Sequence, residues 1–245
     1  AGVSEALSVR DVDLLLSPSG LETAGDYVDF YRSRNADGFI IIGQGHRERM
    51  LRDLSRRDVP MVVWGAVMAK SPYCAVGSDN FLGGRLAGQR FLQKGCQNWL
   101  FVGNTSHDEI RLRYDGLMEA ATQGSDVAVE LLNIDVMAFT ETHDRALEYL
   151  DAKKRPDAVF AFSDTAAMAI ISAFRQRGLV APDNYALVGY NNIPPSEHYN
   201  PAISTIEQNT HSAGAILVEK LMQMIEGGKP KSAMLPTRLI QRETC

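Results

Sequence analysis

The sequence predicts an α/β fold with parallel sheets, and three observations carry that prediction. Short apolar runs of strand length show no polar alternation, which is typical of strands buried on both faces of a parallel sheet. Between these runs, apolar residues recur at three- and four-residue spacing, as they do on one face of a helix. The two patterns alternate along all 245 residues. Repeated strand–helix–strand units build parallel sheets with right-handed crossovers.

Seven apolar runs rich in Val, Ile, Leu and Phe are the candidate strands. In chain order they are Val12–Ser17, Gly38–Ile42, Met61–Trp64, Trp99–Val102, Ala128–Leu132, Ala158–Phe162 and Tyr185–Gly189. Seven strands fit either one large sheet or two smaller ones. The pattern alone does not choose between these arrangements.

Helical patterns fill the gaps between the runs. They cover Glu22–Arg34, Arg47–Arg57, Phe81–Lys94, Glu109–Gln123, Thr140–Ala152, Thr165–Arg177 and Thr210–Glu226. Asp164 precedes one of these patterns and is expected to cap it by accepting bonds from free N–H groups. Gly95, Gly124 and Gly178 each follow a pattern and are expected to end the helix in the left-handed conformation.

The composition excludes several classes of protein. Lys and Arg number 25 against 30 Asp and Glu, and the net charge of -5 argues against nucleic-acid binding through the overall field. No apolar run approaches the roughly 20 residues that span a bilayer, and the first residues do not resemble a secretory signal. Three cysteines without a CxxC pair predict unpaired thiols in a reducing cytosol, hence a cytoplasmic protein without a structural zinc site.

Motifs of catalysis and cofactor binding are not found in the sequence. It contains no GxGxxG after a strand, no GxxxxGK[ST] and no GxSxG. The five histidines are scattered and form no HxxxH pair. The sequence therefore predicts no catalytic residues, no metal site and no cofactor.

Three segments carry a more specific pattern when they are read together. The first is VGSDNFLGGRLAGQRFLQKG, followed by WLFVG. The second is RLRYDGL, early in the next helix. The third runs from PDAVFAFSDTAAMAI through LVGYNNI, a proline and ISTIEQ to a final LPTRLIQRET. Together they resemble the effector-binding core of the LacI/GalR family of bacterial transcription regulators, in the family's order and over nearly the whole chain.

The resemblance implies a periplasmic-binding-protein-like fold: two Rossmann-like lobes joined by three strands, with a ligand cleft between them. It places one lobe at residues 1–103 and 209–233 and the other at 104–208 and 234–245. Residues 1–18 resemble the end of the first core helix and the second strand. The family's helix-turn-helix headpiece and first core strand have no counterpart, and without that strand two sheet edges would be left unpaired.

Arg113 and Asn191 are the principal ligand-binding candidates. Arg113 matches the family's R-x-x-G arginine, which donates to ligand oxygens, although a surface arginine on a charged helix face is the alternative. The neighbouring Arg111 is expected to be solvated or to pair with Asp108 or Glu109. Asn191 stands where many relatives carry Asp, and an amide can donate as well as accept. Losing that negative charge favours an anionic ligand, such as a sugar acid or phosphate, unless Asn191 is only a turn residue.

Six further residues lie in segments that the resemblance places around the cleft. Ser163 is either a ligand contact or a helix cap, and Phe139 either stacks on the ligand or packs in the core. The other four are Asn80, Phe81, His107 and Gln208.

The resemblance implies a ligand-sensing and dimerising core of a LacI-type repressor. Its ligand would be a sugar or sugar-derived metabolite, and the full-length protein would bind operator DNA through the headpiece. A homodimer or tetramer without membrane contact is expected, with Tyr27, Val28, Tyr31 and residues 82–91 supplying part of the dimer surface. A periplasmic sugar-binding protein of a transport system is the alternative, and a sugar-metabolising enzyme is a third reading.

Overall fold

The computed structural model describes residues 2–17, 21–45, 47–136, 138–152 and 155–245. The chain divides into two compact units, the first formed by residues 1–79 and 209–236 and the second by residues 80–208 and 237–245. The expected lobe boundary after residue 103 therefore lies earlier in the chain, between Asp79 and Asn80. The reason is that the strand Asn98–Val102 pairs within the second sheet. The last passage of the chain from the first unit to the second, expected after residue 233, follows Pro236.

The first unit contains a four-stranded parallel sheet in the order β1-β2-β3-β9. Its strands are β1 (Phe39–Ile42), β2 (Met61–Trp64), β3 (Cys74–Ser78) and β9 (Ala233–Leu235). The apolar runs at 38–42 and 61–64 are confirmed as strands. The other two carry Ala, Gly, Ser or Met in place of a long apolar run, so periodicity did not single them out.

Helices cover both faces of the first sheet. They are α1 (Gly2–Ser8), α2 (Ala24–Ser33), α3 (Glu48–Leu54) and α9 (Thr210–Ile225). Met61 and Val63 pack with α2 and α3, whereas Val62 packs on the opposite face with α9. Tyr27 is 6% exposed and meets Phe39 edge-on. Its expected place in a dimer surface is therefore wrong, because its ring belongs to this core.

The expected strand at Val12–Ser17 is not found. This segment follows α1 and has no strand partner, and Leu14, Leu15 and Leu16 are 47%, 59% and 81% exposed. A strand exists only where a neighbour accepts its backbone hydrogen bonds. β1 pairs with β2 on one side, and no other described strand pairs with it. The other edge of β1 is therefore unpaired among the described residues.

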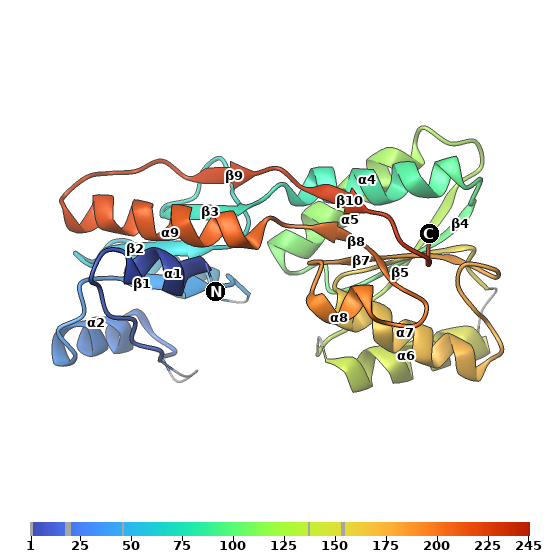
Figure 1. Cartoon of the computed structure of the whole chain (residues 1–245), viewed down its shortest axis with the longest axis horizontal. Coiled ribbons are helices and arrows are strands. Elements are labelled where there is room, and N and C mark those ends of the chain that lie inside the picture. The colour runs from blue at the N-terminus through green and yellow to red at the C-terminus, as the bar shows by residue number, and fades with distance from the viewer. Residues whose placement is uncertain (1, 18–20, 46, 137, 153–154) are drawn as a thin grey trace. The chain divides into compact units, whose positions relative to one another are not determined.

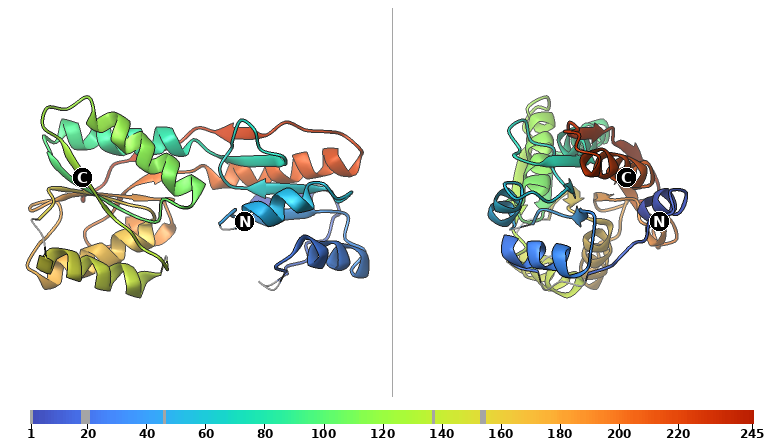
Figure 2. Two further views of the ribbon diagram at one scale, coloured as in Figure 1. Left: turned by 180° about the vertical axis from the view of Figure 1, so that it is seen from behind. Right: turned by 90° about the vertical axis from the view of Figure 1, so that its left-hand side faces the viewer.

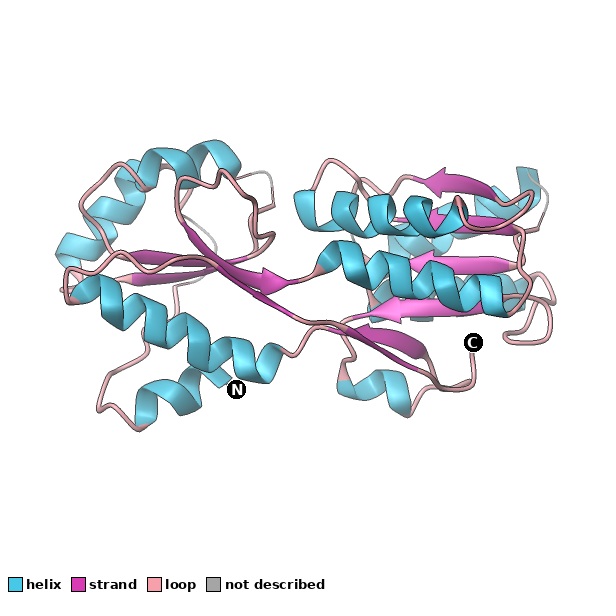
Figure 3. Cartoon of the chain, turned by 90° about the horizontal axis from the view of Figure 1, so that it is seen from above, coloured by secondary structure: helices cyan, strands magenta, loops and turns pink. Residues whose placement is uncertain are grey.

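The second unit contains a six-stranded sheet in the order β10-β8-β7-β6-β4-β5. All neighbouring pairs are parallel except β10 with β8. The strands are β4 (Asn98–Val102), β5 (Ala128–Leu132), β6 (Ala158–Ala161), β7 (Ala186–Tyr190), β8 (Ser204–Glu207) and β10 (Arg238–Ile240). The five parallel strands, all but β10, end at the same edge of the sheet (Figure 3). Short β8 and β10 lay within the family motifs but outside the seven runs.

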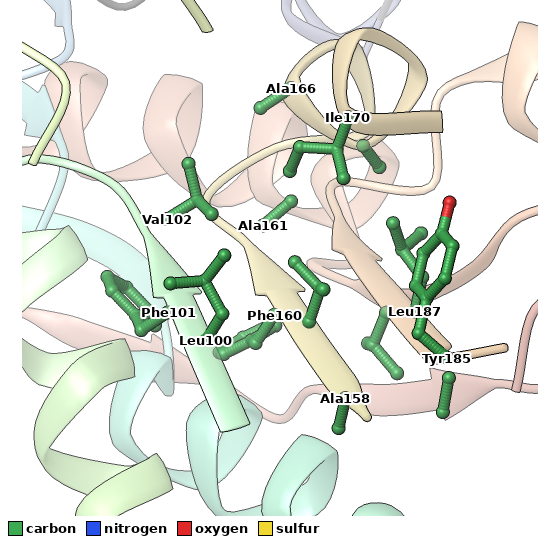
Figure 4. Close-up of a cluster of buried hydrophobic side chains, with 14 of the residues drawn as sticks. Leu100, Phe101, Val102, Ala158, Phe160, Ala161, Ala166, Ile170, Tyr185 and Leu187 are labelled. Carbon is green, nitrogen blue, oxygen red and sulfur yellow. The ribbon is translucent and has the colours of Figure 1, made fainter. Parts of the chain in front are cut away.

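Helices sandwich the second sheet, with α4 (Asn80–Gln93) and α5 (Asp108–Ala121) on one face. On the other lie α6 (Phe139–Ala152), α7 (Asp164–Gln176) and the short α8 (Pro194–Glu197) (Figures 1 and 2). One continuous core joins both faces through the sheet, with Leu100, Phe160 and Leu187 fully buried (Figure 4). Phe91 is fully buried in this core too, so its expected role in a dimer surface is also wrong.

Glycines let α4 and α5 pack at backbone contact. A Cβ at Gly84 would lie 1.9 Å from the carbonyl oxygen of Arg113, and one at Gly116 would lie 2.0 Å from that of Phe81. No side chain fits such gaps. The glycines of LGGR and YDG therefore set the position of the helix turn that carries Arg113.

Two of the three glycines expected to end helices do so in the left-handed conformation. Gly95 and Gly178 take the left-handed conformation, with φ of 75° and 74°. Gly124 does not, and Asp126 two residues later takes it with φ of 61°. Cys74, Cys96 and Cys245 are unpaired thiols, as expected. Among the described residues, no helix combines the length and apolar character that crossing a membrane requires.

Candidate ligand site in the second unit

The candidate site lies at the carboxyl edge of the second sheet, where β6, β7 and β8 end side by side. β7 pairs with both of the others, and its last residue, Tyr190, is in register with Ile206 of β8. Ser163, Asn191 and Gln208 therefore follow three adjacent strands. All eight predicted site residues belong to this unit. Ligands of open α/β sheets bind beyond this edge.

Arg113 reaches this edge from α5, and its guanidinium is bound tightly in place. The residue is only 7% exposed, which contradicts the alternative of a surface arginine. Its Nε donates to Asn80 Oδ1 at 2.8 Å, and its Nη1 donates to the carbonyl oxygen of Phe162 at 2.7 Å. The guanidinium carbon lies 3.6 Å from the centre of the Tyr190 ring. Two protein acceptors and an aromatic face thus fix its plane.

Electrostatics at Arg113 suit a group that donates to a ligand oxygen. Burial lowers the pKa of its guanidinium, while Tyr190, Glu109 and Asp164 act in the opposite direction. An arginine stays protonated under all ordinary conditions, so the site carries a fixed positive charge with little water around it. Arg111, two residues away, pairs with Asp108 at 2.8 Å and with Asp115 at 3.3 Å. The predicted pairing of Arg111 with Asp108 is confirmed.

Asn191 is held in an uncommon backbone conformation. Its φ is 108°, a value that Asn tolerates better than most residues. Its backbone N–H donates to the carbonyl oxygen of Ile206 at 2.8 Å. Its side-chain oxygen accepts from Gln208 Nε2. Asn191 is therefore a turn residue and, in addition, has its amide oriented by the neighbouring strand.

The residues after Asn191 are anchored by a polar network that the sequence analysis missed. Asn192 donates from Nδ2 to Glu207 Oε1 at 2.9 Å, and its Oδ1 accepts from Arg242 Nη2 at 2.8 Å. Arg242 also donates from Nη1 to the carbonyl oxygen of Ile203 at 2.8 Å. Arg238 pairs with Glu207, which lowers the pKa of that carboxyl. The two arginines of the closing LPTRLIQR thus stabilise the GYNN turn. Their spacing in the sequence was the signal that could have predicted this network.

Asp164 is the buried acid beneath this turn. It is the first residue of α7, so the expectation that it caps the helix is wrong; Ser163 is the cap, accepting from the N–H of Ala166 at 3.1 Å. The Asp164 side chain instead accepts from Ile193 N at 2.8 Å and from Thr205 Oγ1 at 2.5 Å. Burial raises the pKa of Asp164 to about 6, although both hydrogen bonds act to lower it.

Three further predicted residues lie at the starts of helices of the same unit. His107 is the residue before α5 and is 7% exposed. Phe81 lies in the first turn of α4 and is 37% exposed. Phe139 begins α6, is 42% exposed and stacks on His143 at 6.4 Å, which contradicts its alternative role in the core. The structure brings Arg113 together with Asn80, and Asn191 with Gln208.

Tyr190 is a further site residue that sequence reasoning missed. Its ring stacks on the Arg113 guanidinium, and its hydroxyl donates to Asn80 Oδ1 at 3.2 Å. An aromatic residue directly before Asn191, at the end of a buried strand, was the signal that could have found it. The site as a whole offers hydrogen-bond donors on a rigid frame. In the described parts of the chain, no group of three or more His, Cys, Asp or Glu side chains has the arrangement of a metal site.

Comparisons with known proteins place the chain in a family. A family model described as periplasmic binding protein-like domain matches residues 89–245. The chain is 30% identical over 207 residues to the HTH-type transcriptional repressor PurR of Photobacterium profundum, covering 82% of this chain and 61% of that protein. It is 27% identical over 236 residues to the PurR of Edwardsiella ictaluri, covering 93% and 69%. The chain thus spans about three fifths to two thirds of these relatives.

Solved structures share the fold. A transcriptional regulator CelR in complex with cellobiose is 25% identical, with a TM-score of 0.84, and the match covers 100% of this chain and 77% of that one. A transcriptional regulator LacI from Bacillus cereus subsp. cytotoxis, described as putative, is 23% identical with a TM-score of 0.88, covering 100% and 89%. These matches agree with the family model and with the motifs. The chain therefore belongs to the family of periplasmic-binding-protein-like domains.

Proposed function

We propose that this chain senses a sugar or sugar-derived metabolite for a LacI-type regulator and performs no chemistry on it. The observation that carries the proposal is the buried guanidinium of Arg113, fixed beside the Asn191 turn at the carboxyl edge of three adjacent strands. Such a rigid fork of donors suits recognition of ligand oxygens. Two relatives that the chain resembles are named as HTH-type transcriptional repressors.

The proposed output is a change in operator binding by the full-length protein. A ligand shifts a conformational equilibrium only if it binds one state better than the other. We propose a homodimer as the active assembly, because two-fold protein symmetry matches a near-palindromic operator. The chain itself, with a net charge of -5, should contribute no DNA contacts.

A thermal-shift screen of the chain against sugars, sugar acids and sugar phosphates tests the proposal. A ligand at 100 times its dissociation constant stabilises the folded state by about 2.7 kcal/mol. We expect at least one compound to raise the melting temperature, and the same compound to change operator binding of the full-length protein. A compound that is bound but leaves DNA binding unchanged would instead favour a periplasmic sugar-binding protein. Turnover of the compound would favour an enzyme.

A further inference from the structure

We propose that Gln208 fixes which group of the Asn191 amide, the donor or the acceptor, faces the ligand. This position therefore selects a sugar derivative that carries an oxyanion, either a carboxylate or a phosphate. The inference rests on the proposed function and names the ligand class of that same site. It assigns Gln208 a positioning role in place of the direct ligand contact expected from the sequence.

The geometry of the two amides carries the first step. Gln208 follows β8 directly, is 8% exposed, and points its Nε2 at Asn191 Oδ1. An amide has one acceptor oxygen and one donor nitrogen. With its oxygen engaged by Gln208, Asn191 has its Nδ2 donor left to face the ligand. Within the described residues, no protein acceptor is found for that nitrogen.

The backbone keeps Asn191 from turning away. Its N–H is bonded to Ile206, and the next two residues are tied down by Thr205, Glu207 and Asp164. A side chain on such an anchored turn keeps a fixed direction. Its preference for an acceptor is therefore built in before the ligand arrives, which is the condition for selectivity.

The charges around the turn also favour an oxyanion. Two carboxylates beside the turn are engaged by the protein itself: Asp164 with Thr205 and Ile193, and Glu207 with Arg238 and Asn192. Arg113 brings a buried positive charge. Asn191 and Arg113 thus offer two donors, which suit a group that only accepts. A sugar hydroxyl in the same place gains less, because its own proton would need an acceptor.

The test uses matched pairs of compounds that differ in the anionic group. D-gluconate is compared with D-glucose, and D-ribose 5-phosphate with D-ribose, by titration calorimetry on the whole 245-residue chain. We expect one acid to bind at least about tenfold more tightly than its neutral partner. The two pairs separate a carboxylate from a phosphate as the preferred oxyanion.

Two nearly isosteric variants should reverse this preference. In Gln208→Glu the new carboxylate can only accept, so Asn191 must donate to it and present its oxygen outward. In Asn191→Asp the position itself becomes an acceptor with negative charge. Each should lower the acid-to-neutral affinity ratio by about tenfold or more. Gln97→Glu is the matched control, because it adds the same charge before β4, at the opposite edge of this sheet.

Each outcome decides the inference. A neutral sugar bound as tightly as its acid, or a ratio unchanged in both variants, overturns it and leaves the proposed function intact. Failure of both acids to bind at millimolar concentration also overturns it. The proposed function is refuted separately, by the absence of any binder in the broader metabolite screen. A ratio that falls equally in Gln97→Glu would show that overall charge, and not Gln208, sets the preference.

Discussion

Asp164 is the single residue whose surroundings have the most direct consequence for stability. Its carboxyl is fully buried, and its pKa is raised from 3.8 to about 6. Between these two values the folded protein holds a proton that the unfolded chain has released. The free energy of unfolding therefore falls as pH rises from about 4 to about 6, and the loss is complete above that range. With one pKa unit at 1.36 kcal/mol, the full effect is about 3 kcal/mol.

Asp164→Asn should flatten this dependence. The amide does not titrate, so the free energy of unfolding of the variant should fall less between about pH 4.5 and 7 than that of the wild type. Urea unfolding at several pH values measures both curves. Asp183→Asn, at an exposed position, is the control and should follow the wild type. Parallel curves for the wild type and Asp164→Asn would contradict the assignment.

The sequence predicted Arg113 and Asn191 as important residues but not the contacts that hold them. Arg113 is fixed by Asn80 and Phe162, which lie 33 and 49 residues away along the chain. Local patterns contain no information on such pairs. Ser163 and Asp164 show a second limit: both can cap a helix, and only the three-dimensional structure shows that Thr205 and Ile193 engage Asp164.

The close packing of α4 on α5 is the feature at the scale of elements that links the fold to the site. The α4 backbone at Gly84 lies against the backbone of Arg113 itself. A change in the separation of these helices therefore moves the residue that we expect to contact the ligand. Stability and ligand binding should respond together to changes at this point.

Gly84→Ala should destabilise the protein by about 1–3 kcal/mol or more, because its Cβ would lie 1.9 Å from the Arg113 carbonyl oxygen. Gly25→Ala in α2 is the matched control: its Cβ would meet only Thr23 Oγ1 at 3.5 Å. Alanine at this exposed first-turn position should change the free energy of unfolding by less than about 0.5 kcal/mol. Chemical denaturation measures both changes, and similar values for the two variants would refute the packing argument.

Elements with a continuous apolar run or a clear helical period were predicted well, and elements without one were missed. All seven predicted helices are present within a few residues of their expected bounds, as are six of the seven strands. Val12–Ser17 failed because strand formation needs a partner that the described chain does not supply. β9 and β10 are three residues each. Periodicity is not measurable over so few residues.

At the scale of the whole molecule, two units with separate cores agree with the resemblance, but the boundary near residue 80 does not. The expected boundary followed a polar stretch after β4. In the structure, α4 and β4 pack with α5 and β6 in the second unit. A change in composition indicates a loop. Only the contacts between elements show to which unit the elements beside that loop belong.

The exposed leucines after α1 predict self-association of the chain. Leu15 and Leu16 are 59% and 81% exposed on a segment without a strand partner, and unpaired apolar edges promote association between molecules. Replacing both with Ser should reduce association in sedimentation velocity and change the free energy of unfolding by less than about 0.5 kcal/mol for each. The control is Leu131→Ser, at a single residue that is 42% exposed. Undiminished association in the double variant would count against this explanation.

The central claim, that ligand binds at the carboxyl edge beside Arg113, is tested most directly by calorimetric titration of Arg113→Ala against Arg111→Ala. The ligand is the tightest binder from the metabolite screen, and circular dichroism verifies folding, with Arg113→Lys used if the alanine variant does not fold. Loss of a charged hydrogen bond predicts about 10- to 150-fold weaker binding for Arg113→Ala. Arg111, paired on the surface with Asp108 and Asp115, should be replaceable without effect. Equal affinities in both folded variants would contradict the claim.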